Sequence, residues 1–107
     1  MQPAFDRFHR YEELVAVLRA FESRRPDLFR VETIGQSHEG RDIHVVVATR
    51  RETGPDADKP GFWVDGNIHA AELTASTACL FLLKTLEEEY GRREDVTRLL
   101  DTRALYV

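Results

Sequence analysis

The sequence predicts an α/β fold, in which helices alternate with strands and pack on a sheet. Three observations lead to this class: helical spacing of apolar residues after residue 11, two β-branched segments separated by a turn, and an apolar strand followed by a turn and a long helix. Such alternation is typical of sheets covered by helices. A length of 107 residues suits one small domain with a single modest core.

Composition excludes several classes of protein. With 42% hydrophobic and 32% charged residues, the chain resembles neither a disordered nor a membrane protein, and no segment approaches the roughly 20 apolar residues of a membrane span. The formal net charge is -4 and the basic residues form no stripe, so we expect no nucleic-acid or membrane partner. The N-terminus has no apolar stretch of signal-peptide length, so a cytoplasmic location is the default expectation. Cys79, in an apolar run, is expected to be a buried inert thiol.

The first element is an amphipathic helix that begins at Tyr11 and ends before Pro26. Polar residues separate apolar ones at helical spacing, namely Tyr11, Leu14, Val15, Leu18 and Phe21. Residues 29–34 and 43–49 are predicted as two strands, because the first alternates in polarity and the second is rich in β-branched residues. Residues 35–40 contain two glycines between them. A hairpin is the simplest interpretation.

The second half of the chain predicts a strand, a turn and a helix. Residues 51–60 combine glycine, proline and charges, so we expect an exposed connecting loop. Residues 61–65 form a short apolar run that predicts a buried strand, and a helix should follow over residues 72–90 and stop near Gly91. A helical turn over residues 95–100 and a strand over residues 104–107 complete the chain, which we expect to stop inside an element.

His69 and Glu72 are the candidate metal ligands, because imidazole nitrogen and carboxylate oxygen both bind zinc. Spacing alone is weak, since His9 and Glu12 are also three residues apart; those two lie at the start of a surface helix and are expected to be solvated. The second pair follows a strand and opens a helix, where ligands bind in α/β folds and where a carboxylate is stabilised. The local physics also allows His69 as a turn residue and Glu72 as an ordinary first-turn acid.

Three segments resemble metallocarboxypeptidases of the carboxypeptidase A type. The sequence Gly-Asn-Ile-His-Ala-Ala-Glu at residues 66–72 is similar to the first zinc motif of that family. Tyr-Glu-Glu-Leu at 11–14, Pro-Asp-Leu at 26–28 and especially Ile-Gly-Gln-Ser-His-Glu-Gly-Arg-Asp-Ile at 34–43 are similar to its opening helix and hairpin, in the same order. The resemblance covers most of the chain.

The resemblance implies a mixed sheet flanked by helices, the phosphorylase/hydrolase-like zinc peptidase fold, of which residues 1–107 would be the truncated N-terminal segment of a single catalytic domain. It implies zinc as cofactor, peptides as substrate and removal of the C-terminal residue by a zinc-bound water. His69 and Glu72 map onto the first two ligands, and Arg41 onto an arginine that binds substrate away from the scissile bond. Arg41 could equally be an exposed turn residue.

The same resemblance implies that this segment holds no catalytic residue. In the family, the third zinc ligand and the general-base glutamate lie downstream, so both would follow Val107, and the segment alone is predicted to be inactive and to bind zinc weakly. The chain departs from the digestive members at Ala71 and Leu73, where those enzymes usually have arginine and tryptophan. Neither position is a ligand, so zinc binding is expected to survive while the substrate preference stays open.

Two alternatives remain at this stage. One is a zinc deacylase of the aspartoacylase or succinylglutamate desuccinylase type, which uses a similar His-x-x-Glu motif but is not expected to have the hairpin motif with Arg41. The other is a non-enzymatic α/β interaction domain in which the motif is incidental. Sequence beyond Val107 would discriminate the three, and the sequence leaves the oligomeric state open.

Overall fold

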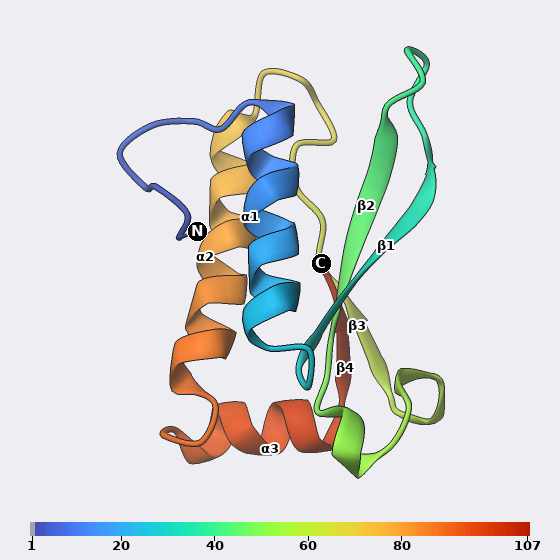
Figure 1. Ribbon diagram of the computed structural model, residues 1–107, viewed down its shortest axis with the longest axis vertical. Coiled ribbons are helices and arrows are strands. Elements are labelled where there is room, and N and C mark those ends of the chain that lie inside the picture. Colours follow the sequence, from blue (N-terminus) through green and yellow to red (C-terminus); the bar gives the residue numbers. More distant parts are fainter. Residues whose placement is uncertain (1) are drawn as a thin grey trace.

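The computed structural model describes residues 2–107, whose helices and strands form a partial mixed α/β fold (Figure 1). One four-stranded sheet has the order β1-β2-β4-β3. In chain order the elements are α1 (Tyr11–Arg24), β1 (Phe29–Gln36), β2 (Asp42–Ala48), the 3-10 turns η1 (Arg51–Thr53) and η2 (Asp56–Asp58), β3 (Gly61–Trp63), α2 (Leu73–Glu89), α3 (Glu94–Thr102) and β4 (Ala104–Tyr106).

The sheet is mixed because β3 and β4 pair in parallel, whereas the other strand pairs are antiparallel. β1 and β2 form the predicted antiparallel hairpin, with an irregularity between Thr33 and Gly35 that interrupts the register. β4 pairs antiparallel with β2 and parallel with β3, so the strand nearest the C-terminus lies between two earlier ones. The expected α/β class and mixed sheet are therefore confirmed.

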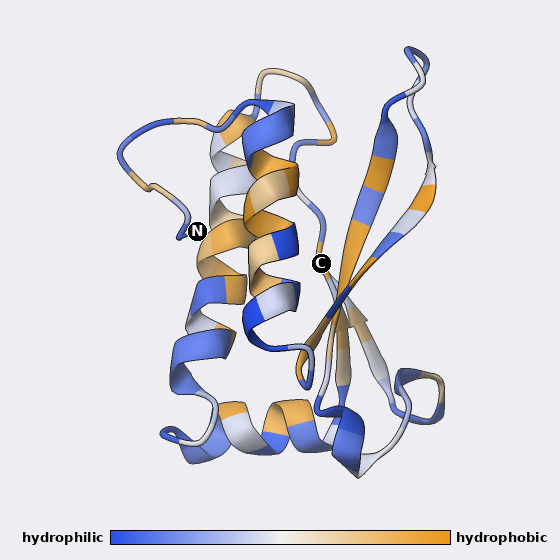
Figure 2. Cartoon of the chain, in the orientation of Figure 1, coloured by the Kyte–Doolittle hydropathy of each residue, from blue (hydrophilic) through white to orange (hydrophobic). Residues whose placement is uncertain are grey.

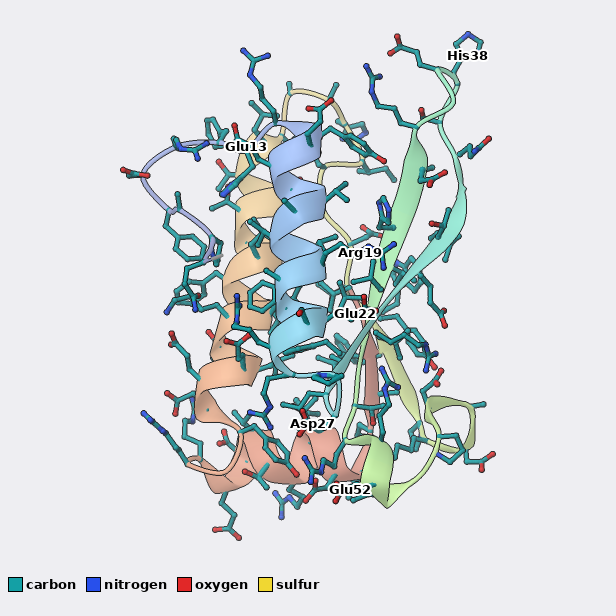
Figure 3. All side chains as sticks on the ribbon, in the orientation of Figure 1. Glu13, Arg19, Glu22, Asp27, His38 and Glu52 are labelled. Atoms are coloured by element: carbon teal, nitrogen blue, oxygen red, sulfur yellow. The ribbon has the colours of Figure 1, made fainter. Side chains whose placement is uncertain are left out.

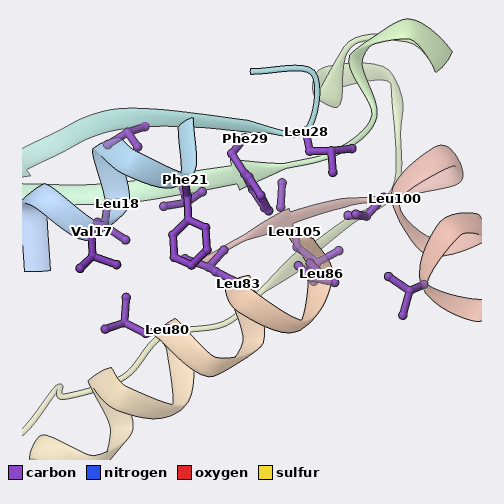
Figure 4. Close-up of a cluster of buried hydrophobic side chains, with 14 residues drawn as sticks. Val17, Leu18, Phe21, Leu28, Phe29, Leu80, Leu83, Leu86, Leu100 and Leu105 are labelled. Carbon is purple, nitrogen blue, oxygen red and sulfur yellow. The ribbon is translucent and has the colours of Figure 1, made fainter. Parts of the chain in front are cut away.

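A single apolar core lies between the helices and one face of the sheet. α1 and α2 run side by side along that face, and α3 crosses their lower ends (Figure 1). Apolar segments of these elements meet where they face one another, whereas the hairpin tip and the end of α2 are hydrophilic (Figure 2). Phe21 of α1 meets Phe29 of β1 edge to face, with ring centroids 5.7 Å apart. Both lie in a buried cluster that also includes Val17, Leu18, Leu28, Leu80, Leu83, Leu86, Leu100 and Leu105 (Figure 4).

The strand predicted over residues 61–65 is shorter and more exposed than expected. β3 ends at Trp63, and the side chains of Phe62 and Trp63 are 64% and 57% exposed. The prediction of a buried strand is wrong because β3 is an edge strand that pairs only with β4. An apolar run marks a segment that favours strand geometry, but it does not say which strands are covered.

The remaining elements follow the sequence closely. α1 and α2 begin and end within one or two residues of the predicted bounds, and α3 is a nine-residue helix where only a turn was expected. The loop 51–60 is more than an exposed connector, because the Lys59 ammonium donates hydrogen bonds to the hydroxyls of Thr49 and Thr53 and to the Arg50 carbonyl, each at 2.8 Å. Across residues 2–107, no helix has the length and apolar character that a bilayer span requires.

Candidate metal centre

The turn that carries the candidate ligands lies between β3 and α2 and packs against the first turn of α2. Its start is fixed to the sheet, because the Val64 amide donates to the Tyr106 carbonyl at 2.9 Å. A Cβ on Gly66 would lie 2.7 Å from the carbonyl oxygen of Ala75, so only glycine allows this approach. Asn67 adopts a left-handed conformation with φ of 67°, which asparagine tolerates better than most residues. The Gly-Asn dipeptide thus sets the direction in which the turn leaves the sheet.

His69 and Glu72 face each other across this turn. The Nδ1 atom of His69 lies 3.0 and 3.1 Å from the two carboxylate oxygens of Glu72. Glu72 is the N-cap residue of α2, yet its side chain makes no capping bond to the helix amides. Both side chains are exposed, His69 by 77% and Glu72 by 53%. The carboxylate is therefore directed at the imidazole and remains accessible to an ion from solution.

The donor atoms of this pair fit zinc. Two ligands at about 2.0–2.1 Å from a tetrahedral zinc ion are separated by about 3.3 Å, which is close to the observed 3.0 Å between Nδ1 and the nearer carboxylate oxygen. Zinc is bound by neutral imidazole and by ionised carboxylate, the two groups that meet here. Within residues 2–107, no group of three or more His, Cys, Asp or Glu side chains could hold a metal ion. The described chain thus offers two ligands that suit zinc, not a complete set.

Arg41 lies at the tip of the β1–β2 hairpin, at the same end of the molecule as the candidate ligands (Figure 1). The tip is a tight turn in which the Gly40 amide donates to the Ser37 carbonyl at 2.9 Å, with φ of 81° at Gly40. The Arg41 guanidinium donates to Glu39 at 3.0 Å and its side chain is 53% exposed. A pair so exposed holds the side chain weakly, so Arg41 is free to exchange Glu39 for another carboxylate or carbonyl.

A groove of about 840 Å³ separates the hairpin from the turn. Arg41 lines it from the hairpin, and Asn67 and Ala70 line it from the turn, whereas the side chains of His69 and Glu72 stand outside it on the exposed surface. Three further lining residues were not singled out from the sequence: Tyr11, Asp42 and His44. Tyr11 donates its phenol to the Asp42 carbonyl at 2.9 Å, and its ring lies 6.2 Å from that of His44. Helical spacing had marked Tyr11 only as a core residue.

The second His-Glu pair has a different environment from the one expected. Glu12 is exposed as predicted, but His9 is partly buried, so the prediction that both are solvated is wrong for His9. The amide of Ala4 donates to His9 Nε2 at 3.3 Å, because residues 2–10 fold back against the helices instead of leaving α1 freely (Figure 1). Spacing could not show this fold-back. Cys79 is half-buried, and burial raises the pKa of its thiol, as an inert cysteine requires.

Comparison with known proteins gives one consistent family. The model of the zinc carboxypeptidase family matches residues 14–107. Carboxypeptidase A2 of Rattus norvegicus is 28% identical over 103 residues, which are 96% of this chain and 24% of that protein. Carboxypeptidase A2 of Mus musculus is 31% identical over 92% of this chain and 22% of its own length, and a zinc carboxypeptidase of Saccharothrix mutabilis subsp. capreolus is 25% identical over 94% and 23%.

Solved structures agree with the sequence relatives. The chain superposes on carboxypeptidase A from Helicoverpa armigera with a TM-score of 0.81 and 26% identity, covering 96% of this chain and 24% of that one. It superposes on thrombin activatable fibrinolysis inhibitor with a TM-score of 0.83 and 25% identity, covering 94% and 24%. The chain therefore spans about a quarter of the length of the relatives it matches.

Proposed function

We propose, because the chain belongs to the zinc carboxypeptidase family, that the complete protein is a metallocarboxypeptidase that hydrolyses the C-terminal peptide bond of peptides. The observation that carries this proposal is the approach of His69 Nδ1 to the Glu72 carboxylate at 3.0 Å on an exposed turn. The turn lies beyond the end of a sheet strand and at the start of a helix, which is where α/β folds place their ligands.

His69 and Glu72 would hold the zinc ion through Nδ1 and one carboxylate oxygen. When bound, zinc supplies Lewis-acid polarisation of a carbonyl and lowers the pKa of a bound water to about 7. The chain supplies the orientation of both ligands: Gly66 packs on α2, and Glu72 leaves its carboxylate unused by the helix cap. Neither ligand is held in place by a residue of the core. The turn can therefore present both to a zinc ion whose remaining ligands come from other parts of the complete protein.

Arg41 and the groove would bind the peptide away from the bond that is cut. The Arg41 guanidinium can donate two parallel hydrogen bonds to a carboxylate or one to a main-chain carbonyl. Binding there requires only that Arg41 leave Glu39, an exposed partner whose side chain is 74% accessible. The groove between Arg41 and Ala70 has a volume of about 840 Å³, within the range of sites that bind small ligands.

The rest of the metal centre would come from other parts of the complete protein. We propose that residues 1–107 are the N-terminal segment of a single catalytic domain, because relatives match over only about a quarter of their length. A third ligand and a general base would be supplied by that remaining part, since catalytic zinc sites use three protein ligands and an open position. The 107-residue segment by itself would then have no peptidase activity and only weak affinity for zinc.

Zinc titration of the complete protein tests the site. We expect His69→Ala to weaken zinc binding by at least about 100-fold and to abolish hydrolysis of a blocked dipeptide. A loss of about 100-fold is the upper end for residues that only orient a metal ligand, and loss of a ligand itself should cost at least as much. His38→Ala is the control for zinc binding, because His38 lies exposed at the hairpin tip, away from the turn, and its removal should leave the zinc affinity unchanged (Figure 3). Wild-type zinc affinity in His69→Ala would contradict the assignment.

A further inference from the structure

A small cavity lies directly behind the turn that carries His69 and Glu72. Its volume is about 180 Å³, and it separates the start of α1 from the turn and from the first half of α2. The N-terminal segment, defined here as residues 2–10, closes one side of it. The lining residues are Phe8, His9, Tyr11, Leu14, Asn67, Leu73, Ser76, Thr77 and Leu80.

Two lining residues have buried polar atoms that no described residue satisfies. These atoms are Nδ1 of His9 and the side-chain carbonyl oxygen of Asn67. A buried polar atom without a partner is destabilising, so native proteins pair nearly all such atoms with protein or with ordered water. Across residues 2–107, only these two side-chain atoms are in that condition, and both belong to the same cavity.

The hydrogen bond on the other ring nitrogen fixes the role of His9 Nδ1. The Ala4 amide donates to Nε2 at 3.3 Å, so Nε2 is an acceptor and the neutral ring carries its proton on Nδ1. His9 therefore presents a donor and Asn67 an acceptor. A single water molecule can accept from Nδ1–H and donate to the amide oxygen, and the cavity exceeds by several-fold the roughly 10–15 Å³ that one water needs.

Several contacts place the N-terminal segment, and with it His9, against the helices. Pro3 is buried, and the rings of Phe5 and Phe81 meet edge to face with centroids 5.7 Å apart, so this segment packs along α2. Arg7 pairs with Glu13 of α1. Residues 2–10 precede residue 14, where the match of the family model begins.

The turn itself has little support of its own. Among the described residues, one main-chain hydrogen bond involves residues 65–71, from the Glu72 amide to the His69 carbonyl at 3.0 Å. Ile68 is 80% exposed and adds no packing. Asn67 is two residues before His69, so a fixed Asn67 side chain would restrict the orientation of the histidine.

We propose that a water molecule in this cavity bridges His9 Nδ1 to the Asn67 side-chain oxygen, and that His9 is thereby a positioning residue for the zinc-binding turn. Both atoms are shielded from solvent in this conformation, so the bridge requires the imidazole and the amide to turn toward the cavity that their residues line. This inference rests on the proposed zinc site. It implies that the N-terminal segment supports the turn through Asn67, which, among the described residues, has no hydrogen bond to the sheet or to α2.

The test compares His9 variants of the complete zinc-loaded protein. His9→Phe keeps an aromatic ring but removes the donor, and His9→Gln keeps a donor. We expect His9→Phe to weaken zinc affinity, measured by competition with a chelator, roughly tenfold and to lower kcat with little change in KM, and His9→Gln to recover most of both losses. Glu12→Gln is the matched control, because Glu12 lies three residues after His9 but its side chain is exposed.

A high-resolution crystal structure of the unaltered protein is the second measurement, and it does not depend on how the variants fold. We expect a water within hydrogen-bonding distance of both atoms; a cavity without one overturns the proposal. So does a His9→Phe protein with lower thermal stability but unchanged zinc affinity. His69→Ala is measured in the same series: if it retains zinc, the proposed function fails, whereas loss in His69→Ala without loss in His9→Phe defeats only the positioning role.

Discussion

The two ends of this molecule are stabilised in different ways. At the packed end, where α3, η1 and the start of β1 meet, the buried polar groups have several partners each. At the metal end, formed by the turn and the hairpin tip, the chemically important side chains are exposed and rest on few contacts. Figure 3 shows the separation, with Asp27 and Glu52 at the packed end and His38 at the hairpin tip.

Thr49 and Tyr90 illustrate the packed end. Thr49 is fully buried, its hydroxyl lies 2.7 Å from the Arg103 carbonyl, and it accepts from the Lys59 ammonium. The guanidinium groups of Arg25 and Arg50 lie 5.7 and 5.6 Å from the centre of the Tyr90 ring. Loss of one such contact leaves others in place. At the metal end, by contrast, the start of the turn has one main-chain hydrogen bond to the sheet, from Val64, and within the described chain residues 65–71 have only the one from the Glu72 amide to the His69 carbonyl.

This contrast predicts that stability and function respond to different substitutions. Core and packed-end changes should lower the free energy of unfolding while leaving the geometry of the ligands intact. Changes at the metal end should alter zinc or substrate binding with little effect on unfolding. Each prediction below tests that separation.

The largest loss of stability is expected for Phe21→Ala. Phe21 is fully buried and contacts Phe29 edge to face, so its removal leaves a cavity that the surrounding helices cannot fill. We expect urea unfolding of the complete protein to show a loss of about 3–5 kcal/mol. Phe62→Ala is the control, because Phe62 is 64% exposed on the edge strand and its removal should cost less than about 0.5 kcal/mol. Equal losses would show that β3 is covered in the complete protein.

The regular elements could be predicted from the sequence because periodicity reports local geometry. The spacing of Leu14, Leu18 and Phe21 marks the buried face of α1, and all three do face the core or pack against it. Coverage of β3 could not be predicted, because exposure depends on which strand lies at the edge of the sheet. The length of α3 was underestimated, since carbonyls of its last turn accept hydrogen bonds from Thr49 and from Thr53 of η1, and no local pattern records such tertiary contacts.

The candidate site could be predicted only in part. His69 and Glu72 do approach each other, because a turn closed by the hydrogen bond from the Glu72 amide to the His69 carbonyl brings residues three apart together. The groove and the partly buried His9 could not be predicted, because each joins segments that are distant in sequence. Asn67 offered one signal, since a Gly-Asn pair before a helix favours a left-handed turn.

A smaller, pH-dependent effect is expected for Asp27→Asn at the packed end. The hydrogen bonds from Arg25, at 3.0 and 2.9 Å, hold the pKa of Asp27 below its usual value, and Arg50 also pairs with it. Because the pKa is lower in the folded state, this carboxylate stabilises the protein above the unfolded value of about 4, and the contribution is lost as the pH falls through the folded value.

We therefore expect Asp27→Asn to lower the free energy of unfolding by about 1 kcal/mol at pH 7, allowing for the partial exposure of the pair, and by progressively less as the solution is made acidic. Glu52→Gln removes a neighbouring carboxylate that is 74% exposed and should have a smaller effect at every pH. A constant difference between Asp27→Asn and the unaltered protein from pH 7 to pH 2 would show that the loss comes from packing and not from charge.

The smallest change in stability, with a clear change in function, is expected for Arg41→Ala. Arg41 contacts only exposed or local groups at the hairpin tip, so its removal should change the free energy of unfolding by less than about 0.5 kcal/mol. If Arg41 binds the peptide across the groove from Ala70, its removal should weaken substrate binding. The KM for a peptide long enough to fill the groove should rise roughly tenfold, which is the cost of one charge-assisted hydrogen bond, and kcat should be nearly unchanged. A blocked dipeptide is the matched control: if Arg41 binds substrate only away from the scissile bond, the dipeptide makes no contact with it and should show the same KM with either protein. An equal rise in KM for both substrates would show that Arg41 maintains the conformation of the hairpin and does not bind the peptide. The metal end would then depend on the fold more than its exposure indicates.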